Sequence, residues 1–307
     1  MQQDHIELKQ RRDLGDTISI YFEFFKKNLT SFLNIFISYN GLFILGFLGV
    51  SYLLVTGFVG MYDSSTYGNA STEIDSALYL GIGGIAFFIL FLATAVLNYS
   101  LAASYMIHYE KNETPTIEKK QVWKLVSDNL GNIILFILLL IVIYVGVFIA
   151  GMVLSIIPLI GSLAYYLLML SFTAWMGVSF MAMLSQKLSV SDALSEGFKL
   201  IKLYYWKSVL VNLVVGMLLG ILLLVVLMIP GVLIGIYAFH SIENGIDLAE
   251  SPVAKVIWTL TLTLVLVLYS FNQSLAQFVN GILYFSLYEE TYNENMRNRI
   301  DQIGAGE

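Results

Sequence analysis

The chain has 307 residues, of which 58% are hydrophobic and only 12% are charged, whereas about a quarter of residues are charged in soluble proteins. This composition excludes an ordinary soluble domain and predicts a polytopic membrane protein. The net charge of -6 gives no sign of nucleic-acid binding, and the absence of cysteine excludes disulfides, thiolate catalysis and cysteine metal sites.

The first 32 residues are charged and contain no short apolar core followed by a cleavage site, so we expect no removable signal peptide. Beyond them, six apolar stretches reach the length of about 20 residues that a helical span needs. They cover approximately residues 33–62, 77–107, 131–157, 159–184, 208–235 and 254–287. The sequence therefore predicts an all-α bundle of six transmembrane helices in a single membrane domain (1–307), with a cytoplasmic tail over 289–307.

Lysine-bearing stretches with helical periodicity lead into the first, third and fifth spans. In the clearest of them, apolar side chains recur at helical spacing while lysines occupy other faces: Val190, Leu194, Phe198, Ile201 and Tyr205. Ser189 or Ser191 can cap its start, and Thr114 or Thr116 can cap the middle stretch. We expect three cytoplasmic amphipathic helices, the first of them within residues 1–32.

The three stretches align by eye. Asn28, Asn129 and Tyr204 then fall at equivalent places just before a span. The alignment suggests a threefold internal repeat of amphipathic helix, span and span.

The basic residues are distributed unevenly between the loops. All but one of the 16 Lys and Arg residues lie in the N-terminal region, the second loop, the fourth loop and the tail. Both termini are therefore expected on the cytoplasmic side of the membrane. The residues expected at the inner leaflet are Lys26, Lys27, Lys119, Lys120, Lys124, Lys199, Lys202 and Lys207. They are either a solvated positive flank or a surface that binds anionic lipid.

The last two spans exceed the thickness of a bilayer. Pro230-Gly231 interrupts the fifth where the apolar core should end, which predicts a break there. The sixth either overhangs the bilayer or tilts.

No acidic or basic residue lies deep within a span, and this argues against an ion-coupled transporter. The most polar intramembrane positions are amides of the last span: Asn272, Gln273, Gln277 and Asn280. Of these, Gln273, Gln277 and Asn280 stand at i, i+4 and i+7, so they share one face of the helix. They either bond to neighbouring helices or line a path for a neutral substrate or lipid headgroup.

No catalytic or metal-binding pattern stands out. His5, His108 and His240 are expected on different sides of the membrane, so they cannot share a metal. Gly177-Val178-Ser179 lacks the following glycine and the histidine that an intramembrane serine protease would need. We expect no catalytic residue, no metal and no cofactor.

Four segments resemble a known family: Arg12 to Ile18, Phe24 to Asn28, Ile229-Pro230-Gly231, and the ending Tyr284 to Glu290. The family consists of six-span membrane proteins of Bacteroidota, similar in plan to the membrane domain attached to some glycerophosphodiester phosphodiesterases. The resemblance covers nearly the whole chain and implies a bacterial inner membrane but no established activity. Members often carry the label beta-carotene monooxygenase, yet the known enzymes of that reaction hold iron with more histidines than the three present here. The phosphodiesterase activity is not expected either, because only a short tail follows Glu290.

These observations favour a non-enzymatic scaffold or accessory subunit of a membrane complex. The alternative is a carrier or handler of lipid or another neutral small molecule. The expected partners are membrane lipids and other membrane proteins, and not nucleic acid.

Overall fold

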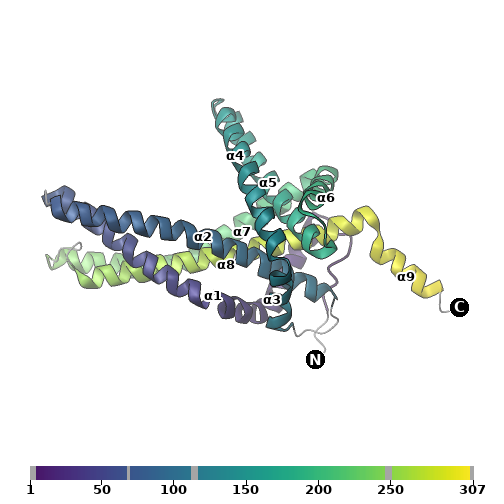
Figure 1. The fold of residues 1–307 in the computed structure, drawn as a ribbon, viewed down its shortest axis with the longest axis horizontal. Helices are drawn as coiled ribbons and strands as arrows, with labels where there is room; N and C mark the ends of the chain where they lie inside the picture. Colours follow the sequence, from purple (N-terminus) through teal and green to yellow (C-terminus); the bar gives the residue numbers. More distant parts are fainter. Residues whose placement is uncertain (1–4, 68–69, 112–116, 246–250, 305–307) are drawn as a thin grey trace. The chain divides into compact units, whose positions relative to one another are not determined.

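The computed structural model describes residues 5–67, 70–111, 117–245 and 251–304. Within these ranges the chain forms helices and no strand, which confirms the all-α prediction (Figure 1). The helices are α1 (Leu14–Tyr67), α2 (Ala70–Lys111), α3 (Lys119–Asp128), α4 (Leu130–Leu154), α5 (Ile160–Gln186), α6 (Val190–Leu203), α7 (Tyr205–Glu243), α8 (Pro252–Tyr292) and α9 (Glu294–Gly304).

Six of the described helices are long and apolar enough to cross a membrane: α1, α2, α4, α5, α7 and α8. Each matches one predicted span, although α4 ends at Leu154, three residues before the predicted end of the third span, and α5 begins at Ile160, one residue after the predicted start of the fourth. On α4, side chains such as Val142 and Val153 are more than 60% exposed, and α7 likewise presents Leu224 and Ile229. An apolar surface of this size is unfavourable in water but suits contact with lipid. The chain is thus a multi-pass membrane protein.

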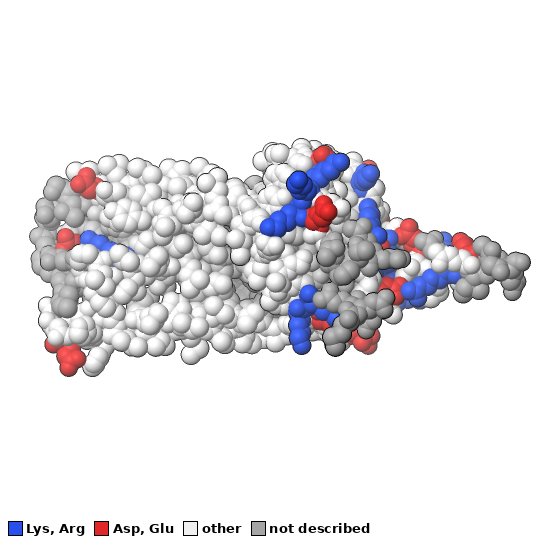
Figure 2. All heavy atoms as spheres, turned by 90° about the horizontal axis from the view of Figure 1, so that it is seen from below, with Lys and Arg blue, Asp and Glu red and all other residues white. Residues whose placement is uncertain are grey.

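The chain divides into two compact units. Unit 1 comprises residues 1–35, 99–218 and 274–307, and unit 2 comprises residues 36–98 and 219–273. Unit 1 carries all Lys and Arg residues except Lys255. On the face that Figure 2 draws, the surface of unit 2 is uncharged along most of its helices.

In unit 1, α4 and α5 form an antiparallel hairpin with a tight turn. Leu159 has a positive φ of 62°, and a β-carbon at Gly161 would overlap the carbonyl oxygen of Leu154. Only glycine fits at that position. The hairpin in turn packs against α6, where Trp175 Nε1 donates to the carbonyl of Leu194 at 2.9 Å.

At two of the three repeat positions identified in the sequence one helix ends and the next begins, and at the third the helix is continuous. Asn129 separates α3 from α4, and Tyr204 separates α6 from α7, each with non-helical backbone angles. At Asn28, by contrast, the helix continues. The Asn28 side chain donates to the carbonyl of Phe24 within the same helix and accepts from Tyr105. The first stretch is therefore part of α1, which begins at Leu14, and the described residues before it are not helical.

The helix starts confirm one predicted cap. Ser189 is the N-cap of α6, and its hydroxyl accepts from the backbone N–H of Asp192. The N-cap of α3 is Glu118, without a side-chain cap bond. The proposed caps Thr114 and Thr116 lie outside the described residues.

The predicted break at Pro230 is wrong, because α7 continues through it to Glu243. Proline removes one backbone N–H, so the carbonyl four residues earlier loses its helical partner. Pro230 is buried, and packing of a helix against its neighbours allows proline to be tolerated in membrane helices. α8 is likewise unbroken over 41 residues.

Unit 2 is held by close helix contacts and a buried polar triad. Gly83 of α2 lies against Leu53 and Leu54 of α1, and Val55 packs with Trp258 of α8. The polar triad comprises Asn40, Asn98 and Ser270. Asn40 donates to Asn98 at 2.9 Å, and Asn98 donates to the Ser270 hydroxyl at 2.7 Å. Three helices are thus joined by hydrogen bonds between side chains, as is common where water is absent.

Candidate functional site

The amide positions predicted on α8 are divided between the two units. Asn272 and Gln273 belong to unit 2, whereas Gln277 and Asn280 belong to unit 1. Asn272 is half-buried. Gln273 is buried, and its Oε1 has no hydrogen-bond partner among the described residues.

Gln277 and Asn280 form a buried cluster with Gly177 of α5, which we call the amide cluster. Both amide side chains have 0% exposure. Gln277 Nε2 donates to the carbonyl of Gly177 at 3.4 Å, and a β-carbon at Gly177 would overlap the amide of Asn280. The helices α5 and α8 therefore approach closely, and the missing side chain of Gly177 makes room for Asn280.

The amide cluster keeps unused hydrogen-bonding capacity. Gln277 Oε1 and both amide atoms of Asn280 are buried without a partner among the described residues. An unsatisfied buried polar group costs about 1–3 kcal/mol. The close approach of Gly177 leaves no space for a side chain between the two helices.

A second close contact joins α5 to α6. A β-carbon at Gly197 would overlap the Ser179 hydroxyl and lie 2.8 Å from the Ser179 Cα. The Ser179 hydroxyl is buried without a partner among the described residues. Gly177, Ser179 and Gly197 were not predicted as packing residues, although a glycine within a span, such as Gly177, was an available signal for close helix packing.

The described residues contain no catalytic arrangement around Ser179. His5 stacks on Tyr109, and His108 Nδ1 lies 2.8 Å from the carbonyl of Ser104. His240, in unit 2, contacts Asn244. Over the same described ranges, no group of three or more His, Asp or Glu side chains could hold a metal ion.

The segment before α1 is fastened to the end of α2 and to α9 by polar contacts, which we call the terminal clasp. Lys9 lies 3.3 Å from Glu110 and 3.4 Å from Glu294. Arg299 pairs with Glu7 at 2.5 Å. Burial acts to lower the pKa of Lys9, but the two nearby carboxylates outweigh it and hold the pKa above its ordinary value.

Lys207 belongs to this clasp and differs from the lysines with which the sequence grouped it. Its ammonium lies 2.8 Å from Glu290 and 3.1 Å from the Ser286 hydroxyl, and it donates to the carbonyl of Arg12 at 2.5 Å. The Lys207 side chain is only 14% exposed. It therefore points into the protein.

The other predicted inner-leaflet lysines lie at the surface of unit 1. Lys26, Lys124 and Lys202 are exposed, Lys27 pairs with Glu23 on the same helix, and Lys199 donates to the Tyr292 hydroxyl at 2.6 Å.

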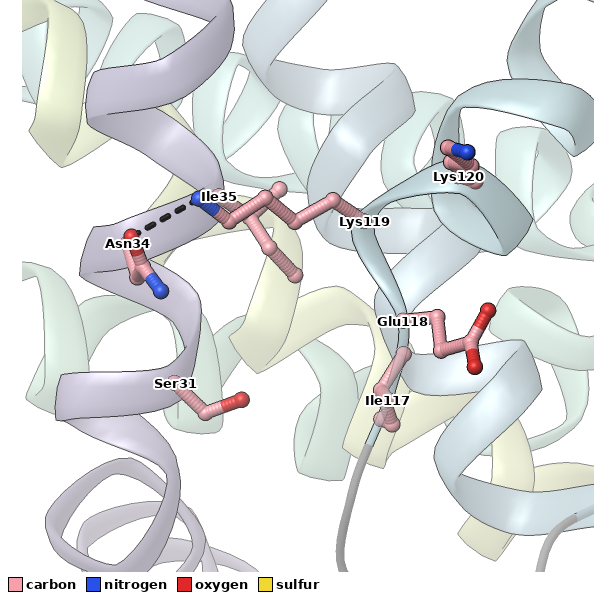
Figure 3. Close-up of a pocket in the computed structure, with 7 residues that line it drawn as sticks. All are labelled: Ser31, Asn34, Ile35, Ile117, Glu118, Lys119 and Lys120. Carbon is pink, nitrogen blue, oxygen red and sulfur yellow. Dashed lines mark hydrogen bonds between the residues drawn. The ribbon is translucent and has the colours of Figure 1, made fainter.

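Lys119 and Lys120 line a pocket between α1 and the start of α3, with a volume of about 470 Å³ (Figure 3). The α1 side contributes Ser31, Asn34 and Ile35, and residues 117–120 form the other side. Lys119 Nζ donates to Asn34 Oδ1 at 2.9 Å. This contact holds one ammonium group at the wall of the pocket.

Comparison with known proteins gives no relative. No protein-family model matches the chain, and neither a curated protein nor a solved structure matches it. What the chain does must therefore be inferred from its own residues.

Proposed function

We propose that the protein is a non-enzymatic integral membrane protein that acts as a scaffold or accessory subunit of a membrane complex. The observation that carries this proposal is the closed amide cluster, in which Gln277 and Asn280 have 0% exposure and Gly177 fits against the Asn280 amide. A carrier would need those polar groups at the wall of an accessible path. The exposed apolar surfaces of α4 and α7 offer area for lipid or for partner helices.

The competing function is a carrier or handler of lipid or another neutral small molecule. The unpartnered amide atoms of Gln277 and Asn280 favour it, because a polar substrate could satisfy them. Replacement of Gln277 distinguishes the two functions.

For Gln277→Leu we expect a modest loss of stability and no change in lipid movement. The variant removes the bond to Gly177, and such bonds contribute about 0.6 kcal/mol on average within membranes. Thermal unfolding of the purified protein measures the first effect, and movement of a fluorescent phospholipid in proteoliposomes measures the second. Asn212→Leu is the control, because its amide donates within its own helix to Ser208.

A carrier gives a different result. The unchanged protein would then move the phospholipid faster than protein-free vesicles do, and Gln277→Leu would abolish the movement at unchanged stability. The accessory role is tested separately by purification in native membrane discs, where a partner protein should be retained at a constant ratio. Recovery of this chain alone would contradict that role.

We further propose that the protein lies in a bacterial inner membrane with both chain ends in the cytoplasm. The resemblance to Bacteroidota proteins supports the location, and the placement of Lys and Arg supports the orientation. The chain has no native cysteine, so single cysteines report the topology. Replacements at the exposed Ser65 and Glu243 should react with an impermeant thiol reagent in intact cells. Replacements at the exposed Ser195 and Met296 should react only after permeabilisation, and the reverse pattern would overturn the orientation.

A further inference from the structure

The pocket between α1 and α3 combines two cationic groups with neutral polar groups. Lys119 and Lys120 line it together with the Ser31 hydroxyl and the Asn34 amide. One carboxylate, that of Glu118, also lines the pocket, and both Glu118 and Lys120 lie on the side away from Asn34 (Figure 3). Cations therefore outnumber the carboxylate, which favours an anionic ligand.

The pocket lining also includes two buried apolar side chains, Ile35 and Ile117. The position of Lys119 is set by its bond to Asn34, so part of the entropy cost of ordering a long side chain is already met. A volume of about 470 Å³ lies within the range of small-molecule sites.

The exposed face of α3 next to the pocket carries further aromatic and basic side chains. Trp123 stands one helical turn after Lys119 and is 41% exposed, and Lys124 follows it. After Asn129, α4 begins with the exposed Leu130. Indole rings favour the boundary between headgroups and acyl chains, and basic side chains near it attract anionic lipid.

We propose that this pocket binds the phosphate headgroup of an anionic phospholipid, whose acyl chains lie along the apolar surface that begins at Leu130. Lysine binds phosphate as a point charge, and the Ser31 and Asn34 side chains can bond to headgroup hydroxyls. The lipid is preferred to free phosphate because Trp123 and the apolar start of α4 adjoin the basic residues. The proposal requires that the chain lie in a bilayer, but it holds whether or not the protein is a scaffold.

The test measures retention of phosphatidylglycerol by the purified full chain, with native mass spectrometry and with thermal stabilisation on lipid addition. In Lys119→Gln/Lys120→Gln we expect affinity to fall about thirtyfold, because each basic residue near the surface contributes a factor of about five. The matched control is Lys26→Gln/Lys202→Gln, which removes the same charge from two other exposed positions of unit 1 and should keep the affinity within about threefold. Lys119→Arg/Lys120→Arg keeps both charges and should retain binding, which would show that the site folds without the two lysines.

Three results would overturn the site. Equal losses in the two double Gln variants would mean diffuse attraction to the whole basic surface. Stabilisation by glycerol phosphate as strong as that by phosphatidylglycerol would assign the pocket to a soluble phosphate. Equal retention of phosphatidylcholine would exclude selection for an anionic headgroup. None of these results depends on whether a partner protein is recovered.

Discussion

Gly177→Ala is expected to destabilise the protein by about 2–3 kcal/mol, because the added methyl group would overlap the Asn280 amide. Overpacking of a filled core costs about 1–3 kcal/mol when side chains or backbone must shift. Asn280 is short and fully buried, so it has little room to move. Thermal unfolding in detergent, followed by the loss of the monodisperse peak in size exclusion, measures the effect.

Gly216→Ala provides the matched control on α7. Nothing lies within 4 Å of a β-carbon at Gly216, so the added methyl group should cost nothing, and the greater helix propensity of alanine should stabilise the protein by up to about 1 kcal/mol. The double variant Gly177→Ala/Asn280→Ala should lose less than the sum of the single variants, because removal of the amide opens space for the methyl group. Equal unfolding temperatures for Gly177→Ala and Gly216→Ala would show that α5 and α8 do not meet as described.

An added β-carbon would meet a flexible side chain at some glycines and backbone atoms at others. A β-carbon at Gly281 would meet the sulfur of Met106, the far end of a flexible side chain that can rotate away. At Gly197 it would meet the backbone of Ser179, which cannot. Glycine is therefore required more strictly at Gly177 and Gly197 than at Gly281.

Much of the fold could be predicted from local sequence. Hydropathy and length identify the six long helices, because a span must bury its backbone polar groups in helical bonds wherever lipid surrounds it. The helix ends at Asn129 and Tyr204 were not predicted, but the short-range chemistry of capping identifies the N-cap of α6 at Ser189. These features depend on residues within one or two turns of each other.

Contacts between distant helices were not predictable in this way. Hydropathy shows which residues lie in the membrane but not which helices are neighbours. The Gly177 and Asn280 contact joins residues about a hundred positions apart, and the triad of Asn40, Asn98 and Ser270 joins three helices. Asn40 was not singled out in the sequence, because one amide in an apolar stretch carries no signal of its partner.

Pro230 shows the limit of a local rule. In water-soluble helices an internal proline often ends the helix, and the sequence predicts a break for that reason. In α7 the residues on both sides are apolar, and an ended helix would expose unpaired backbone groups to lipid. Loss of one hydrogen bond costs less than loss of several, so the helix continues to Glu243.

For Lys207→Gln we expect a loss of about 2 kcal/mol in the free energy of unfolding. Exposed ion pairs contribute about 0–1 kcal/mol to stability, whereas breaking a buried pair costs about 3–5 kcal/mol. The Lys207 and Glu290 side chains are 14% and 29% exposed, so the cost of breaking this pair should lie between these two cases. The lost ammonium also leaves the Arg12 carbonyl and the Ser286 hydroxyl without their donor.

Lys202→Gln on the exposed face of α6 is the matched control and should be neutral. The exchange Lys207→Glu/Glu290→Lys should recover part of the loss, since the charges again attract. If Lys207 instead faced the lipid headgroups, both lysine variants would have the same small effect on unfolding, and the exchange would be no more stable than Lys207→Glu alone.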